Sequence, residues 1–160
     1  MSITWNDLTV NIERLDKDGL ISDWRWLVGD AAQPILISST GDAYLQERNG
    51  EVFLLSTGDG TYEKVADSYE DFRHKLRDTN LVNECFLAAI VAQLKEQGLV
   101  LKPGMLYSFK ELPVLGGDYV AENFELADIE VHFSITGQVH KQVKDIPAGE
   151  AIQLNAVWRE

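Results

Sequence analysis

The sequence predicts a single domain of the α+β class, with an antiparallel β-meander, a central pair of helices and further C-terminal strands. Three observations support this prediction. Short apolar runs separated by glycine-containing turns occupy residues 34–66, two helical patterns follow directly, and alternating apolar residues return near the C-terminus. Strands and helices in separate runs are typical of α+β folds rather than of parallel βαβ sheets. A length of 160 residues suits one compact domain.

The composition is that of a folded protein with a substantial hydrophobic core. Hydrophobic residues make up 45% of the chain. No apolar run approaches the ~18–20 residues needed to span a bilayer, and the first ten residues lack the basic and apolar regions of a signal peptide. The single cysteine, Cys85, allows no intrachain disulfide, which fits a reducing compartment. These features together predict a cytoplasmic protein.

The formal net charge is −12 at pH 7. Direct binding to nucleic acid or to an anionic membrane requires a basic surface, so this charge argues against both partners. Two interpretations stay open. The charge serves solubility alone, or it attracts a basic partner protein over long range.

Residues 1–22 are expected to form an N-terminal extension and residues 23–160 the domain itself. A short helix is expected around Trp24 and Leu27, with Ser22 or Asp23 as its N-cap and with Pro34 beyond its end. Four strands of the meander are expected at residues 35–38, 43–47, 52–55 and 62–65. The connecting segments, STGD, RNGE and STGDG, each contain a glycine that can adopt a positive φ.

Two helices are expected after the meander. The first begins at Ser68, which with Asp71 resembles a capping box in which Asp replaces the usual Glu or Gln. The second is expected to run without interruption from residue 80 to residue 97, before Gly98 in a left-handed conformation. Its apolar residues recur every four positions, at Val82, Phe86, Ile90 and Leu94. Cys85 is expected to be buried beside this face and unreactive.

The C-terminal third is expected to return to strands, the first at residues 105–109. Residues 112–119 are expected to be irregular because they contain a proline and a glycine pair. Residues 128–135 alternate between apolar and polar, which predicts a strand with one exposed face. A three-residue loop would return the chain as a strand over residues 138–143, which places His132 opposite His140. A turn at residues 147–149 and a last short strand complete the domain.

Few patterns in the sequence point to catalysis. The LGGDY segment is not a GxGxxG motif, and no helix is expected directly after it to form an anion site. There is no GxSxG motif, and Cys85 lies within a predicted helix. Acids are plentiful, but nothing singles out a catalytic pair. We therefore expect a protein without enzymatic activity or cofactor.

The main alternative is a small-ligand or metal-binding domain. On the expected strand face, His132, His140 and Glu130 would form a set that suits zinc or iron. An uncharacterised structural domain is a further alternative. The TGDGTYE segment lacks the pattern of a calcium loop and predicts a hairpin turn.

Acidic residues concentrate between Glu111 and His140, where the chain has no Lys or Arg. Acids mixed with aromatic residues on an irregular segment suit a recognition surface, although a solvated face without a partner is the alternative. Gly116 and Gly117 are expected to shape the loop, and Pro113 to stiffen its entry. The expected contact residues are Asp118, Tyr119, Glu122, Glu125 and Glu130.

Five segments resemble the C-terminal domain of type VI secretion DNase-immunity proteins, a family long labelled as a domain of unknown function. They are DWRWLVG, PILISSTGDAYL, VADSYEDFRHKL, KPGMLYSFKELPVLGGDY with the following Asn123, and VHFSITGQVHKQVKDIPAG. The P-V-L-G-G-[DE]-Y and G-Q-[IV]-H patterns within them are specific. The resemblance extends from Asp23 to Ile152.

This resemblance implies a bacterial cytosolic protein that binds and neutralises a toxin directed at the cell's own DNA. Longer relatives carry a GAD-like domain ahead of this one, which we expect to be absent because only 22 residues precede the resemblance. The layout is also similar to the SUKH group of immunity proteins. The family offers no catalytic residues. An acidic protein would associate rapidly with the basic DNA-binding surface of a cognate toxin and cover it. The sequence does not indicate an oligomeric state.

Overall fold

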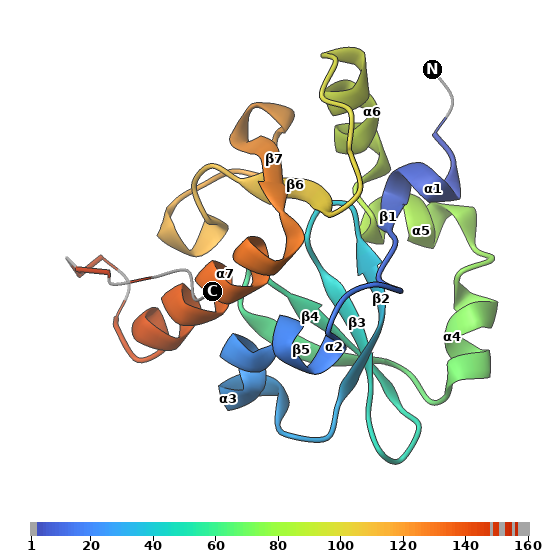
Figure 1. The fold of residues 1–160 in the computed structure, drawn as a ribbon, viewed down its shortest axis with the longest axis horizontal. Helices are drawn as coiled ribbons and strands as arrows, with labels where there is room; N and C mark the ends of the chain where they lie inside the picture. The colour runs from blue at the N-terminus through green and yellow to red at the C-terminus, as the bar shows by residue number, and fades with distance from the viewer. Residues whose placement is uncertain (1–2, 148, 151–152, 155, 157–160) are drawn as a thin grey trace.

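The computed structural model describes residues 3–147, 149–150, 153–154 and 156. They form an antiparallel five-stranded sheet in the order β1-β2-β3-β4-β5 and a separate two-stranded sheet, β6-β7. Helices cover both faces of the larger sheet (Figure 1). The predicted α+β class is confirmed.

The central meander consists of β2 (Gln33–Ser38), β3 (Ala43–Gln46), β4 (Val52–Ser56) and β5 (Thr61–Ala66). Each strand pairs antiparallel with the next, as predicted for residues 34–66. Successive residues of β3 point to opposite faces of the sheet. Tyr44 therefore belongs to one hydrophobic cluster and Leu45 to the other. Both faces of the sheet are buried at β3, which divides the core into two halves.

The N-terminal residues pack against this sheet. They form α1 (Trp5–Leu8), β1 (Thr9–Val10), α2 (Lys17–Leu20), η1 (Ser22–Trp24) and α3 (Arg25–Val28). Strand β1 pairs with β2 at the edge of the sheet. The helix expected near Trp24 exists as η1 followed by α3. Neither Ser22 nor Asp23 caps α3, because its N-cap position is Trp24 and no side chain bonds there.

Helix α4 (Tyr69–Lys75) begins as predicted. The Ser68 hydroxyl accepts a hydrogen bond from the backbone N–H of Asp71 at 3.0 Å. In a capping box, the Asp71 carboxylate would accept from the backbone N–H of the N-cap residue, Ser68. Here it accepts instead from the N–H of the preceding residue, Asp67, at 2.9 Å.

The long second helix was predicted wrongly, because the structure divides it into α5 (Thr79–Cys85) and α6 (Ala88–Glu96). Leu87, between them, adopts a left-handed conformation with φ of 53°. Gly98, after α6, has φ of 84°, as predicted. The expectation of a buried Cys85 is also wrong, because the residue is exposed at the end of α5.

The second sheet pairs β6 (Met105–Phe109), which was predicted, with β7 (Phe124–Asp128), which was not. The loop between these strands, residues 110–123, contains two short 3-10 turns, η2 (Pro113–Leu115) and η3 (Ala121–Asn123).

Helix α7 (Ile129–Val143) replaces the predicted C-terminal hairpin. Its N-cap is Asp128, whose side chain accepts from the backbone N–H of Val131 at 3.0 Å. The expected strands at residues 128–135 and 138–143, and the loop that joined them, are therefore wrong. The strand face that would have set His132 opposite His140 does not exist. The expected final strand lies largely outside the described residues.

The elements sort into layers around the larger sheet (Figure 1). Phe72 of α4 and Phe86 after α5 pack with Tyr44 on one face. Ile129 and Phe133 of α7 pack on the other face with apolar residues of the N-terminal helices and the strands. Within the described part of the chain, no helix is long and apolar enough to cross a membrane.

Candidate protein-binding surface

The β6–β7 loop is closed by the side chain of Asn123. Its Oδ1 accepts from the backbone N–H of Glu111 at 3.0 Å, and its Nδ2 donates to the carbonyl of Glu111 at 2.8 Å and to that of Asp118 at 2.9 Å. The N–H of Lys110 also donates to the carbonyl of Asn123 at 2.7 Å. One amide group thus joins the start, the middle and the end of the loop.

The turn within this loop has a backbone that restricts its residues. Pro113 opens η2, where its fixed φ fits the first turn position and its missing N–H is not needed. Gly116 has φ of 109°, a value that side chains disfavour. A Cβ atom at Gly117 would overlap with the carbonyl oxygen of Glu111. The chain therefore passes too close to itself for any larger residue at position 117.

Tyr119 joins the loop to the turn between β4 and β5. Its hydroxyl donates to Oδ1 of Asp59 at 2.8 Å, and its ring meets Phe109 edge-on, with ring centroids 5.5 Å apart. Burial, and then the bond to Asp59, raise the pKa of the Tyr119 hydroxyl, which therefore stays a donor. A Cβ atom at Gly58 would lie 2.6 Å from that hydroxyl, so a side chain at position 58 would displace the Tyr119 hydroxyl.

The loop exposes several large apolar side chains. Four of its side chains are large, hydrophobic and solvent-exposed: Val114 (45%), Leu115 (38%), Tyr119 (41%) and Val120 (44%). Three exposed acids, Glu111, Asp118 and Glu122, lie in the same loop. An apolar centre with a polar rim is the usual anatomy of a protein–protein interface. We refer to these seven residues as the loop surface.

The structure distributes the five predicted contact residues unequally. Asp118 and Glu122 line one shallow depression with Glu111 and Val120. Tyr119 lies beside them in the loop, and Glu125 is exposed on β7, opposite Ser108 of β6. Glu130 is not part of this group. It lies in the first turn of α7 and lines a different depression, with Asp16, Asp23 and Ser134.

Sequence reasoning missed two turns, residues 39–42 and 56–59, that support this loop. The tetrapeptide STGD occurs twice, at residues 39–42 and 56–59, and the two copies interlock. The Thr57 hydroxyl donates to the carbonyl of Gly41 at 2.8 Å, and the Thr57 N–H donates to Oδ1 of Asp42 at 3.1 Å. The second copy supplies Asp59, the partner of Tyr119. The repeated tetrapeptide was a signal that could have linked the two turns.

His132 and His140 of α7 hold these turns in place. Nε2 of His132 lies 3.0 Å from the carbonyl oxygen of Gly41, and Nδ1 lies 2.6 Å from the hydroxyl of Ser108. A carbonyl can only accept, so Nε2 carries the proton and Nδ1 accepts from Ser108. Nε2 of His140 lies 2.7 Å from the carbonyl of Thr57. Both rings are buried, and burial lowers the pKa of His132 to about 4.

These contacts overturn the expected metal set. The nitrogens of His132 are directed at backbone and hydroxyl groups, and Glu130 is exposed in the first helical turn. Among residues 3–147 and the other described positions, no group of three or more His, Cys, Asp or Glu residues could hold a metal ion. The two histidines are instead neutral, and their hydrogen bonds join α7 to the turns that contain Gly41 and Thr57.

Residues 66–140 match the family model described as T6SS immunity protein Tdi1, C-terminal. Over these residues, this finding confirms the resemblance to type VI secretion immunity proteins. The matched segment begins at the last residue of β5 and includes α4, α5, α6, the second sheet, the loop surface and most of α7. All five predicted contact residues lie within it. No curated protein matches the chain.

Proposed function

We propose that this protein is an immunity protein that neutralises a secreted toxin by direct binding, and that the loop surface is the part of the molecule that meets the toxin. The observation that carries the proposal is the combination of exposed apolar side chains with a fixed backbone. Asn123 and the Tyr119–Asp59 bond hold the loop before any partner arrives. A preorganised surface loses little conformational entropy on binding, so more of its contact energy appears as affinity.

The charge supports a toxin of the nuclease type. A nuclease is basic where it holds DNA, and the present chain has a net charge of −12. The loop acids Asp118 and Glu122, with Glu125 on the adjacent strand, would face lysine and arginine side chains of the toxin. Opposite charges accelerate association, and binding over the DNA site would exclude the substrate. This mechanism requires no catalytic step and operates in the cytoplasm, where such a toxin finds DNA.

Each loop residue has a separate role in this proposal. Val114, Leu115, Tyr119 and Val120 form the apolar centre that is removed from water on binding, which supplies most of the affinity. The surrounding carboxylates supply rate and specificity. Gly116, Gly117 and Pro113 fix the path of the chain. Glu130 lies apart from this group and would contact the toxin only at the margin of the interface.

The test is survival of cells that produce the toxin together with variants of this protein. One variant reverses three acids of the proposed surface, Asp118→Lys, Glu122→Lys and Glu125→Lys. The matched control reverses three exposed acids elsewhere, Glu63→Lys, Glu70→Lys and Glu84→Lys. Both variants carry the same net charge, so a difference between them reports position rather than total charge.

Loss of protection by the loop variant alone, with both variants folded, is the expected result. Equal protection by the two variants would contradict the placement of the interface. Failure of the unmodified protein to bind or protect against the toxin encoded beside it would contradict the immunity function itself.

A further inference from the structure

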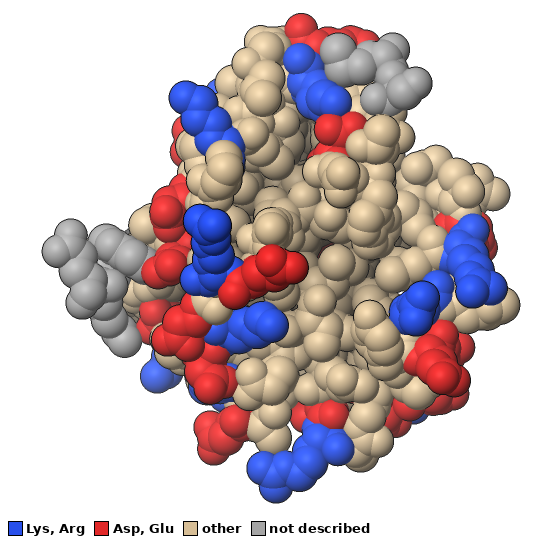
Figure 2. Space-filling view, turned by 45° about the vertical axis from the view of Figure 1, so that its right-hand side comes forward, with Lys and Arg blue, Asp and Glu red and all other residues tan. Residues whose placement is uncertain are grey.

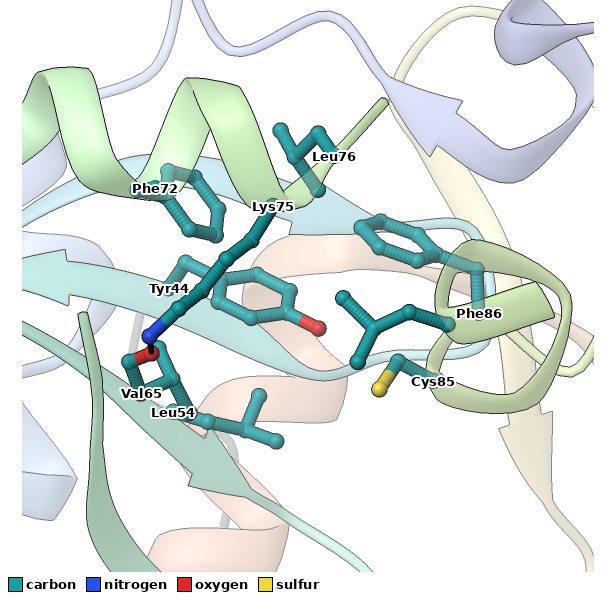
Figure 3. A pocket seen from close by; sticks show the side chains of 9 residues that line it. Tyr44, Leu54, Val65, Phe72, Lys75, Leu76, Cys85 and Phe86 are labelled. Atoms are coloured by element: carbon teal, nitrogen blue, oxygen red, sulfur yellow. Dashed lines mark hydrogen bonds between the residues drawn. The ribbon is translucent and has the colours of Figure 1, made fainter. Parts of the chain in front are cut away.

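A pocket lies between the larger sheet and helices α4 and α5 (Figure 3). None of its lining residues belongs to the loop surface. Its volume is about 240 Å³. The strands contribute Tyr44, Leu54 and Val65, and the helical segments contribute the remaining walls: Phe72, Lys75, Leu76, Leu81, Cys85 and Phe86. Figure 2 faces the side of the molecule on which α4 and α5 lie, and shows a broad uncharged area with charged side chains along its margins.

The interior of the pocket is almost entirely apolar. Lys75 is its one charged residue, and the Lys75 ammonium is turned away. It donates to the carbonyl of Val65 at 2.8 Å and lies 3.3 Å from the Asp71 carboxylate. Only the methylene stem of Lys75 therefore forms a wall. The hydroxyl of Tyr44 points into the pocket, toward Cys85 (Figure 3). This hydroxyl and the Cys85 thiol are the polar groups that a ligand would meet.

The wall formed by α5 depends on an unusual backbone conformation. Leu87 is the one non-glycine residue with a positive φ within the described segments. Its left-handed turn ends α5 and brings Phe86 against Tyr44, with ring centroids 5.4 Å apart. A continuous helix, which the sequence pattern favours, would not make this turn. Strain of this kind costs about 1–2 kcal/mol per residue and concentrates at ligand sites and switch regions.

We propose that this pocket binds a small, planar, apolar molecule with one hydrogen-bonding atom, of the size and shape of indole. An engineered cavity of roughly 150 Å³ lined by Leu, Ile and Phe binds benzene. A pocket of about 240 Å³ has room for two fused rings. The rings of Tyr44, Phe72 and Phe86 offer aromatic contacts to such a ligand, and the Tyr44 hydroxyl can accept from or donate to its heteroatom.

The test titrates the toxin-free protein with indole, and with indene, which has the same shape but lacks the N–H. Calorimetry measures affinity, and amide NMR shifts identify the site. Val65→Phe fills the pocket from the edge strand, and Leu81→Trp closes its mouth. The matched control is Val100→Phe, the same substitution at a residue that is 63% exposed and outside the pocket lining. Tyr44→Phe removes the hydroxyl alone.

Indole is expected to bind saturably and to shift the amides of α4 and α5. Val65→Phe and Leu81→Trp should each weaken binding at least tenfold, and Val100→Phe should leave it unchanged. Tyr44→Phe should weaken the binding of indole about three- to tenfold, which is the value of one hydrogen bond. The same substitution should leave the binding of indene unchanged. Absence of saturable binding, or equal binding by the filled variants with intact melting curves, would overturn the proposal.

The toxin takes no part in these titrations, so their failure would leave the immunity function untouched. Val65→Phe should still protect cells from the toxin. If the unmodified protein does not bind indole and Val65→Phe abolishes protection, the pocket receives a side chain of the toxin, and the small-ligand proposal is wrong.

Discussion

The side-chain amide of Asn123 contacts both polar backbone groups of Glu111, which lies twelve positions earlier. Oδ1 accepts from the N–H at 3.0 Å, and Nδ2 donates to the carbonyl at 2.8 Å. The same Nδ2 also donates to Asp118 at 2.9 Å. One side chain therefore satisfies three backbone groups of the loop.

Replacement of Asn123 by alanine should loosen the loop. Three hydrogen bonds are lost, each with a net value of about 0.5–1.5 kcal/mol, and we expect the free energy of unfolding to fall by about 1.5–4.5 kcal/mol. Amide hydrogen exchange at Glu111 should accelerate. Asn83→Ala, at an exposed position of α5, is the matched control and should change neither quantity appreciably. Unchanged exchange at Glu111 in the Asn123 variant would contradict this role.

Gly117→Ala should destabilise the protein more than Gly50→Ala. A Cβ atom at position 117 overlaps with the carbonyl oxygen of Glu111, so the backbone must move. At Gly50 the same atom meets nothing within 4 Å, and only the positive φ of 95° is disfavoured. The control should cost about 1–2 kcal/mol and Gly117→Ala more than that. Urea denaturation measures both. A smaller effect at Gly117 would show that the loop can relax freely.

Asp42 predicts a pH dependence of stability. Burial raises the pKa of Asp42 from 3.8 to about 7. The hydrogen bond from the Thr57 N–H lowers this pKa, and the charge of Asp59 raises it further. The folded state therefore binds more protons than the unfolded state between these values, and this residue reduces stability as pH rises from about 4 to 7. Asp42→Asn mimics the protonated acid. Relative to the unmodified protein, the variant should gain about 1–2 kcal/mol of stability between pH 5 and 7. A constant difference over that range would refute the assignment.

His132 predicts the opposite dependence. Its pKa falls from 6.5 to about 4 because it is buried, so the unfolded state binds more protons between these values. The contribution of His132 to the free energy of unfolding is complete above about pH 6.5 and decreases as pH falls toward 4. His132→Ala should remove this dependence and lower the free energy of unfolding by about 2–4 kcal/mol through lost hydrogen bonds and packing. His74→Ala, on the exposed side of α4, is the control and should have little effect.

Helix α7 shows where sequence patterns mislead. Alternation of Ile129, Val131, Phe133 and Ile135 predicted a strand, but the buried positions include His132, Ser134, Thr136 and His140. Polar residues were assigned to solvent, although each of these four has a hydrogen-bond partner inside the protein. With the histidines counted as buried, the spacing of three and four residues indicates a helix. Asp128, three residues before Val131, was an available N-cap signal.

The break at Leu87 had no comparable signal. Residues 80–97 contain neither proline nor glycine, and helical periodicity continues across the break. Packing of Phe86 between Trp5 and Tyr44 accompanies the left-handed turn, and such a contact between distant segments is invisible in a local pattern. The meander was predictable for the opposite reason. Each of its turns depends on a glycine within the short segment that joins two strands. Gly41, Gly50 and Gly60 all have positive φ.

The candidate surface was predictable in composition but not in geometry. The absence of Lys and Arg between Glu111 and His140 marked the acidic segment, and the glycine pair marked an irregular loop. The contribution of Asp59 was hidden, because it lies sixty positions from its partner Tyr119. Glu130 was grouped with the loop acids because it lies in the same stretch without Lys or Arg, whereas the structure places it in the first turn of α7.

Stopped-flow mixing at low and high salt measures the rate at which this protein associates with its toxin, and this rate tests whether the acidic loop recognises the toxin. Reversing Asp118, Glu122 and Glu125 should slow association about tenfold or more at low salt. The control reversal of Glu63, Glu70 and Glu84 should have a smaller effect, and the difference should shrink at high salt. Equal association rates for the two variants would contradict an acidic loop that recognises the toxin.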